Sequence, residues 1–398
     1  MDKKVIFRCD VMHEDSSLCR AYAGLSLPAT PYELQDAMER AHLDGGAALY
    51  IDVLDYTQFP FLAPYLSDET DLPALNALAE KLATLEPWQV DAFEGLLLME
   101  GKKPCPVTRP TIYDLAASAG ECQVLYAART DEELGQFYVE NGFVPETDNL
   151  PEPIYELLDY RKIGEKMRSG EGGVFLRHGS GYVTLVGDLK EEFKDLDLTP
   201  KAPDYAVLLE VGLPDRGDPI LLKLPCSRND LKSVPKHFEA RGWCDLTWRC
   251  ADCRIPSLCD AISTTDNIVF INFAASQLAE IPREQLKGCK ALIEAAEIRD
   301  LTDATSLLDQ IRDYIFTPQF DSPEAVARSE LEFALGAEDA ALAIPFMNLR
   351  AYGEKLMEAH NQMMTAYGVI EREDQQPIRT MQEQQDFAAR GEMEVMQM

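Results

Sequence analysis

Residues 130–160 contain no lysine or arginine. Nine carboxylates are spread through this segment, together with regularly spaced apolar side chains such as Leu134, Phe137 and Tyr138. Residues 41–80 also lack any lysine or arginine. Exposed surfaces of folded proteins usually mix charges of both signs. The absence of one sign over two segments that also carry core residues therefore predicts folded surfaces of uniform negative charge.

Other absences limit the class of protein. The sequence has no long apolar run, so we expect no signal peptide, no transmembrane helix, and a cytoplasmic protein whose cysteines are reduced. It has no His-Glu-x-x-His motif, no Gly-x-Ser-x-Gly motif and no glycine-rich phosphate loop before a lysine. An acidic chain offers too many carboxylate pairs to rank any for acid–base catalysis. We therefore predict a protein that is not an enzyme and that has no cofactor.

The whole chain is strongly acidic. Its 398 residues include 69 Asp and Glu against 37 Lys and Arg, for a net charge of -32. Phosphates would be repelled, which argues against direct binding to DNA or RNA. Such a charge either keeps the protein soluble or attracts a basic protein surface, and on charge alone solubility is the simpler explanation.

Four blocks of sequence recur in the same order in the second half. LPATPYELQDAMERAHL, ALYIDVLDY, LNALAEKLATLEPW and LLDYRKIGEKMRSG have their counterparts in LPCSRNDLKSVPKHFEARGW, DLTWRCADC, INFAASQLAEIP and FMNLRAYGEKLMEAH. We interpret this order as a tandem duplication. The predicted organisation is a first module over residues 1–188, a linker over 189–203, a divergent second module over 204–373 and a mobile tail over 374–398.

The local patterns within each module predict an α+β fold. VIFRCDV alternates like a strand, and Thr30 precedes a helix that begins at Pro31. TDEELGQFYVENG predicts a helix that stops at Asn141 and Gly142, and VFLRHGSGYVTLV predicts a hairpin. We expect an elongated tandem of two related modules, each with small antiparallel sheets and a helical bundle segment.

One cluster of cysteines allows two interpretations. Cys250 and Cys253 form a Cys-x2-Cys pair, which Cys244 and Cys259 flank at equal distance. Four such thiolates could hold a structural zinc ion. The alternative is a set of buried, reduced cysteines on a strand and the loop after it.

The first half contains motifs of a known family. LNALAEKLATLEPWQVDAFEGLL, IYDLAASAGECQVLYAARTDEELGQFYVEN and YELLDYRKIGEKMRSGEGGVFLRHGSGYV together resemble the antirestriction proteins of the ArdA type. The resemblance covers residues 72–183 well, the preceding strand–helix–strand part loosely, and the second half less well.

The resemblance implies a function. It implies a protein whose acidic surface mimics B-form DNA, inhibits Type I restriction–modification enzymes and is carried by a mobile genetic element, with a homodimer as one possible state. The partner would be a basic DNA-binding protein. The matched segments contribute eight acidic candidates, which are Asp52, Asp55, Asp131, Glu132, Glu133, Glu140, Glu156 and Asp159. The base-free segments add Asp68, Glu69, Asp71, Glu146, Asp148 and Glu152.

The sequence also departs from this family. A basic cluster of Arg161, Lys162, Lys166, Arg168 and Arg177 does not suit a DNA mimic, and we expect it at an internal or subunit contact. In the second module, Arg249 falls opposite Asp52 and Asn348 opposite Asp159. The alternative function is therefore an acidic scaffold of a mobile element that binds another basic protein, possibly with structural zinc.

Overall fold

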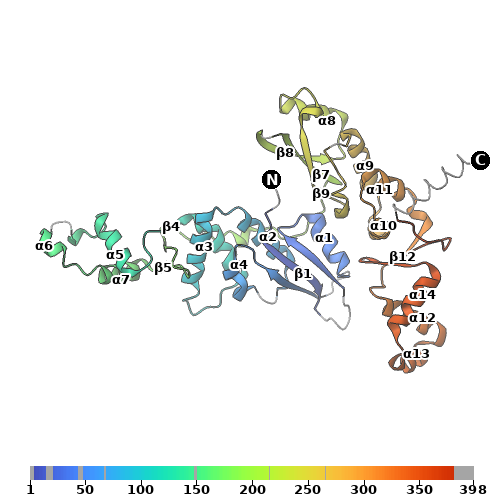
Figure 1. Cartoon of the computed structure of the whole chain (residues 1–398), viewed down its shortest axis with the longest axis horizontal. Helices are drawn as coiled ribbons and strands as arrows, with labels where there is room; N and C mark the ends of the chain where they lie inside the picture. Colours follow the sequence, from blue (N-terminus) through green and yellow to red (C-terminus); the bar gives the residue numbers. More distant parts are fainter. Residues whose placement is uncertain are drawn as a thin grey trace, which may run out of the picture. The chain divides into compact units, whose positions relative to one another are not determined.

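The structure is a computed structural model, and it shows a mixed α+β protein (Figure 1). Helices account for 48% of it, and it contains four small three-stranded antiparallel sheets among the residues that it describes. These residues are 4–14, 21–43, 48–66, 69–147, 150–214, 216–264 and 266–380. The predicted α+β class is confirmed. Most of the predicted tail, residues 381–398, lies outside the described residues.

The chain divides into two compact units. The first comprises Met1–Asp10, Ser26–Pro28 and Ile51–Pro200, and the second comprises Val11–Leu25, Ala29–Tyr50 and Lys201–Met398. The division therefore runs through the first sheet as well as close to residues 189–203. The predicted module boundaries and the tandem arrangement stay predictions.

The first sheet and three helices form the beginning of the chain. The sheet has the order β2-β1-β3, with β1 (Phe7–His13), β2 (Tyr22–Leu27) and β3 (Leu49–Asp55). The helices α2 (Leu72–Ala83), α3 (Pro87–Glu100) and α4 (Arg109–Ala117) follow it. Asp71 begins α2, because its Oδ1 accepts a hydrogen bond of 3.0 Å from the backbone N–H of Ala74.

The first unit also contains a second sheet and, next to it in the sequence, the segment from Asp131 to Glu171. We call this segment, which runs from the start of α5 to the end of α7, the α5–α7 lobe. The strand order is β4-β6-β5, with β4 (Cys122–Leu125), β5 (Val174–Phe175) and β6 (Tyr182–Leu185). The helices are α5 (Asp131–Glu140), α6 (Glu152–Tyr155) and α7 (Tyr160–Glu171). The predicted helix and hairpin are confirmed: α5 ends at Asn141, Gly142 follows with φ +70°, and β5 pairs with β6.

The second unit contains two further sheets and most of the remaining helices. The first has the order β8-β7-β9, with β7 (Val207–Leu213), β8 (Arg216–Leu224) and β9 (Thr247–Cys253), and the second has the order β10-β12-β11, with β10 (Tyr314–Thr317), β11 (Met363–Thr365) and β12 (Gly368–Arg372). The helices are α1 (Pro31–Arg40), α8 (Arg228–His237), α9 (Ile268–Glu280), α10 (Arg283–Ala295), α11 (Leu301–Leu308), α12 (Pro323–Leu335), α13 (Ala337–Ala343) and α14 (Leu349–His360). Apolar side chains of β7, β9, α9, α10 and β12 meet in one large buried cluster that includes Val207, Trp248, Ile271, Leu292 and Ile370. A separate small cluster joins α12, α14 and β12 through Val326, Met357 and Val369.

Short 3-10 helices connect these elements. They are η1 (Pro60–Tyr65), η2 (Ala119–Glu121), η3 (Pro145–Thr147), η4 (Phe193–Asp195), η5 (Trp243–Asp245), η6 (Pro256–Leu258), η7 (Ile311–Asp313) and η8 (Ile344–Phe346). No helix of the described residues is both long enough and apolar enough to cross a membrane.

The two halves of the chain share local features. The order strand, strand, helix, strand occurs in β1-β2-α1-β3 and again in β7-β8-α8-β9, and in both sheets the first of the strands is central. A cis peptide bond joins Leu27 to Pro28 and Leu224 to Pro225. The helix that follows has a capping box in both cases, with Thr30 and Ser227 as the caps. These parallels are those that a duplication would produce, although they do not establish one.

A buried charge network holds α1 against the rest of the second unit. The ammonium of Lys290 on α10, which is 2% exposed, lies 2.6 Å from Asp36 Oδ1 and 2.8 Å from Glu39 Oε2 on α1. Tyr367 donates a hydrogen bond of 2.9 Å to Asp36 Oδ1, and burial, followed by the charge of Asp36, raises the pKa of this tyrosine. At the start of α1, Thr30 Oγ1 donates to Asp252 Oδ1 at 2.7 Å. The helix is therefore held at both ends by buried polar contacts.

The variant Lys290→Ala tests this network. It leaves two carboxylates buried without their cation, so we expect the free energy of unfolding to fall by about 3–5 kcal/mol. Urea denaturation followed by circular dichroism measures the change. Lys355→Ala, at an exposed lysine of α14, is the matched control and should change stability by less than about 0.5 kcal/mol. Equal stability of the two variants would show that the network contributes nothing.

Candidate functional site

The α5–α7 lobe is built around two glycines that bring the helix backbones into contact. A Cβ atom on Gly135 would lie 1.8 Å from the carbonyl oxygen of Tyr160, and one on Gly164 would lie 1.8 Å from that of Asp131. No side chain fits at either position, because this distance is far below van der Waals contact. The apolar side chains of Leu134 and Tyr138 pack in the same core. The charged side chains of the two helices are therefore held on a fixed backbone.

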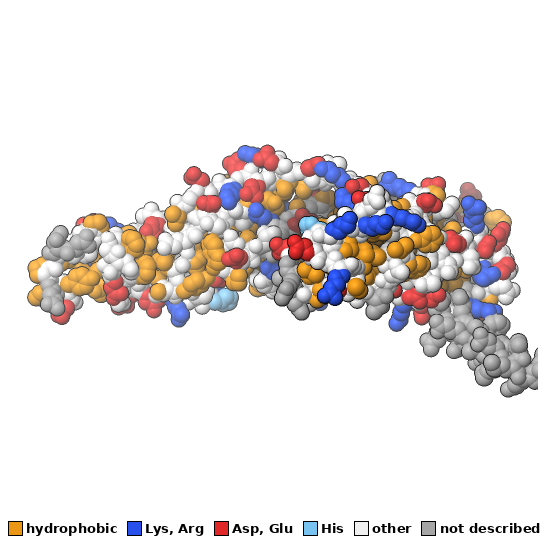
Figure 2. Space-filling model, turned by 90° about the horizontal axis from the view of Figure 1, so that it is seen from above, with side chains coloured by type: hydrophobic (Ala, Val, Ile, Leu, Met, Phe, Trp, Pro, Cys, Tyr) orange, Lys and Arg blue, Asp and Glu red, His pale blue; other side chains and the backbone are white. Residues whose placement is uncertain are grey.

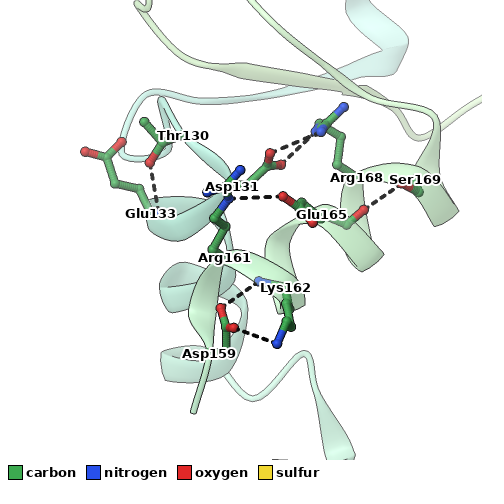
Figure 3. A network of polar contacts seen from close by, with 9 residues as sticks. All are labelled: Thr130, Asp131, Glu133, Asp159, Arg161, Lys162, Glu165, Arg168 and Ser169. Atoms are coloured by element: carbon green, nitrogen blue, oxygen red, sulfur yellow. Dashed lines mark hydrogen bonds and ion pairs between the residues drawn. The ribbon is translucent and has the colours of Figure 1, made fainter. Parts of the chain in front are cut away.

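The lysines and arginines of α7 are paired with carboxylates of the same lobe, and Figure 3 shows the pairs made by Arg161, Lys162 and Arg168. Arg168 binds both carboxylate oxygens of Asp131, with distances of 2.7 Å from Nε to Oδ1 and 3.1 Å from Nη2 to Oδ2. The other three pairs are Arg161 with Glu165 at 3.1 Å, Lys162 with Asp159 at 3.1 Å, and Lys166 with Glu146 at 3.6 Å. Arg168, whose side chain is 32% exposed, lies at an internal contact of the lobe. The side chains of Arg161, Lys162 and Lys166 are 74%, 80% and 75% exposed, so these three pairs lie at the surface, and a subunit contact for them stays a prediction.

Four of the predicted carboxylates of the α5–α7 lobe have no basic partner among the described residues. Glu132, Glu133 and Glu140 are exposed on α5, and Glu156 is exposed between α6 and α7. No lysine or arginine of the described residues forms an ion pair with them. Glu133 Oε2 accepts a hydrogen bond of 2.7 Å from the backbone N–H of Arg129, and Glu140 Oε1 accepts one of 2.7 Å from Gln136. Both interactions leave the negative charge uncompensated.

Two exposed carboxylates of the lobe are stabilised in their charged form. Asp159 caps α7, and the hydrogen bond of 3.1 Å that it accepts from the backbone N–H of Lys162 is the main reason for its lowered pKa. A backbone hydrogen bond, followed by the charge of Lys166, lowers the pKa of Glu146. Both groups therefore stay ionised at lower pH than an ordinary carboxylate.

A carboxylate that was not among the predicted residues anchors the end of α7. Glu171 accepts hydrogen bonds from the hydroxyl of Tyr138 at 2.8 Å and from that of Tyr182 at 3.0 Å. Burial, followed by the interactions with Glu171, raises the pKa of both tyrosines. Glu171 therefore links α7 to α5 and β6 through these hydrogen bonds. Its position beside glycines in SGEGG did not indicate this role in the sequence.

The remaining predicted carboxylates differ in their surroundings. Asp52 and Asp55 are exposed on β3, and Asp71 is exposed at the start of α2. Glu69 is only 4% exposed and forms an ion pair with Arg109, so its prediction as part of an exposed acidic surface is wrong. Asp68 and Asp148 lie outside the described residues, and of Glu152 only the backbone, at the start of α6, is described.

The four cysteines of the second half are not arranged as a zinc site. Cys250 and Cys259 form a disulfide, which corrects the prediction that these cysteines are reduced. Cys253 is fully buried, and burial raises the pKa of its thiol to about 12, whereas Cys244 is exposed. Throughout the part of the chain that the structure describes, no group of three or more His, Cys, Asp or Glu side chains is placed to hold a metal ion.

Comparison with known proteins finds no family model and no curated protein sequence that matches the chain. The similarity to ArdA-type proteins therefore depends on the motifs quoted above, and the geometry of the α5–α7 lobe has to be judged on its own chemistry.

The variant Gly164→Ala tests the backbone contact between α5 and α7. Its Cβ must displace the carbonyl of Asp131, so we expect a loss of about 1–3 kcal/mol in the free energy of unfolding. Gly170→Ala is a control on the same helix, because a Cβ there meets nothing within 4 Å. That control should be neutral or stabilising by up to about 1 kcal/mol. Thermal unfolding compares the two, and an equally stable Gly164→Ala protein would contradict the close approach.

Proposed function

We propose that the protein inhibits a Type I restriction–modification enzyme, or a related defence nuclease, by occupying its DNA-binding channel as a mimic of B-form DNA. One observation carries this proposal. Each α7 base is paired with a carboxylate of the α5–α7 lobe, while Glu132, Glu133, Glu140 and Glu156 face solvent without a basic partner among the described residues. The lobe therefore presents excess negative charge despite the basic cluster in its sequence.

The spacing of these charges suits a surface that binds phosphates. Glu132 and Glu140 are eight residues apart on α5, which corresponds to about 12 Å along the helix axis. One strand of duplex DNA rises about 3.4 Å per phosphate, so about three to four phosphates cover the same length. A basic channel that neutralises phosphates would meet a comparable row of carboxylates here.

Rigidity supports the same function. A charge that is fixed before binding loses little conformational entropy when its partner arrives. The backbone contact at Gly135 and Gly164, the paired Arg168 and Asp131, and the anchor at Glu171 all hold α5 in place. Long-range attraction should then steer the protein to a basic surface, and salt should weaken the interaction.

An acidic scaffold that binds another protein of basic surface is the second candidate. Phe333 at the end of α12 and Phe346 in η8 are 88% and 90% exposed, and Leu342 on α13 is 72% exposed. Large apolar side chains at the surface favour a protein partner. They lie among acids such as Glu332 and Asp339, which suits a basic partner. This candidate needs no zinc ion.

A competition titration tests the proposal. A Type I restriction enzyme bound to labelled DNA at low salt is titrated with this protein and, separately, with an unrelated acidic protein of equal net charge. We expect stoichiometric displacement of the DNA by this protein alone. Displacement no better than that by the control protein would rule out mimicry of DNA in this enzyme.

Neutralising part of the α5 surface should weaken the inhibition. The triple variant Glu132→Gln, Glu133→Gln and Glu140→Gln removes uncompensated charges but keeps Asp131, which is needed to hold Arg168. We expect the inhibition constant at low salt to rise on the order of tenfold, and the difference to shrink at high salt, because salt screens exposed charges. The measurement is the same competition titration at two salt concentrations.

The matched control neutralises three exposed acids of the second unit, with Glu330→Gln, Glu332→Gln and Glu338→Gln. It has the same net charge as the α5 variant. Equal weakening by both variants would mean that total charge, and not the α5 surface, governs the inhibition.

A further inference from the structure

The exposed side of α8 carries bases at regular intervals. Arg228, Lys232 and Lys236 follow one another at every fourth position, and all three are exposed. Residues four apart on a helix lie on the same side of it and are separated by about 6 Å along its axis. The three cations therefore form a row about 12 Å long, which we call the α8 stripe.

The α8 stripe has no carboxylate partner. None of its three bases forms an ion pair or a side-chain hydrogen bond with any residue that the structure describes. Asp230 lies two residues from Arg228 and two from Lys232, and residues two apart do not face each other on a helix. Its Oδ2 instead accepts hydrogen bonds from Ser227, at 3.2 Å from the backbone N–H and 2.7 Å from the hydroxyl. The positive charge of the stripe is therefore not compensated by its own helix.

Bases on the sheet beside α8 are paired. Lys223 on β8 lies 2.7 Å from Asp204 Oδ1, and Arg249 on β9 forms an ion pair with Glu210 on β7. The missing partner is thus a property of the α8 stripe and not of every base in this part of the unit. An acid that compensates the stripe has to come from another molecule.

Apolar side chains border the beginning of the α8 stripe. Val269 and Phe273 of α9 are 61% and 55% exposed, and they share one side of that helix because they are four residues apart. Between them in the sequence, Asn272 accepts a hydrogen bond of 2.8 Å from the backbone N–H of Cys226 and donates one of 3.1 Å to its carbonyl oxygen. Cys226 lies two residues before Arg228. The exposed side of α9 is therefore fixed beside the turn that leads into α8.

Basic and apolar side chains thus occur together at this surface. Figure 2 looks onto the side of the molecule at which Figure 1 places α8, and it shows Lys and Arg side chains gathered next to hydrophobic ones. Exposed apolar side chains favour a protein partner, and uncompensated cations favour a partner that carries negative charge. A ligand that satisfies both kinds of side chain has to be acidic and partly apolar.

We infer that the α8 stripe, together with Val269 and Phe273, binds an acidic segment of another protein. Carboxylates of that segment pair with the three bases of the stripe, and one of its apolar side chains packs on the exposed side of α9. A helical segment suits the spacing, because acids at every fourth position of a helix also repeat at about 6 Å. The inference is independent of the proposed inhibition, since it uses neither α5 nor α7.

Nucleic acids and anionic membranes are the other polyanions that a basic stripe attracts. Both extend far beyond a row of about 12 Å, so their binding would bring further negative charge close to a chain of net charge -32. A short acidic segment meets less of this repulsion, which is screened over about 8 Å at physiological ionic strength. The phosphate backbone of a nucleic acid also offers nothing for Val269 and Phe273 to pack against. These observations favour a protein segment.

Fluorescence anisotropy of a labelled peptide tests the inference. The probe is a synthetic helix of about 16 residues with Glu at every fourth position and with Leu and Phe on the adjacent side. We expect saturable binding to the full-length protein, weakened at least about tenfold by Lys232→Glu combined with Lys236→Glu, because like charges then face each other. Arg328→Glu with Lys355→Glu, at two exposed bases of α12 and α14, is the control of equal charge change.

The variant Phe273→Ser tests the apolar part of the surface. It should bind the probe roughly fivefold more weakly, because less apolar area is removed from water on binding. It should bind a second peptide, with Ser in place of Leu and Phe, as tightly as the wild type does. A Phe273→Ser protein that binds the first probe like the wild type would overturn the assignment of α9 to the site.

A neutral variant distinguishes lost binding from misfolding. Lys232→Gln with Lys236→Gln changes two exposed side chains without reversing their charge, so it should melt like the wild type and still bind the probe more weakly than the control does. No saturable binding by the wild type would overturn the inference, as would equal weakening by the stripe variants and the control. So would tighter binding of a DNA duplex, or of vesicles that contain phosphatidylserine, if the Lys232 and Lys236 reversals abolish it.

Discussion

The backbone contact between α5 and α7 is the constraint on which the acidic surface depends. With Gly135 and Gly164 at the crossing, the carboxylate of Asp131 comes within reach of Arg168, and the outer side of α5 is left to Glu132, Glu133 and Glu140. Any larger side chain at either glycine would separate the helices and the paired charges with them. The distribution of charge on the lobe is thus decided by two residues that carry no side chain.

Local sequence patterns were sufficient to predict the elements. The cap at Thr30 predicted the start of α1, and the Asn141-Gly142 pair predicted the end of α5. Each of these signals acts within one turn of helix, so neighbouring residues contain all the information that is needed. The hairpin of β5 and β6 was likewise predicted from a local pattern, the segment VFLRHGSGYVTLV.

Charge partners could not be predicted in the same way, because they join distant segments. Glu69 lies in a segment without any base, yet Arg109, forty residues later, pairs with it in the interior. Glu171 was hidden among glycines, and its two tyrosines come from other elements. A count of charges along the chain records which segments are acidic, but it does not record which acids reach solvent. The disulfide of Cys250 and Cys259 is a further feature that the spacing of cysteines alone could not distinguish from a metal site.

The partnership of α1 with Lys290 also has a consequence for the synthesis of the protein. Asp36 and Lys290 are separated by 254 residues, and the segment between them contains most of the first unit. At a rate of about 5–20 residues per second, the ribosome needs roughly 13–50 seconds to add that segment. During this time α1 has left the ribosome but has no cation for its two carboxylates. The polar contacts of α1 are therefore completed only after the ribosome has made Lys290, in the second half of the chain.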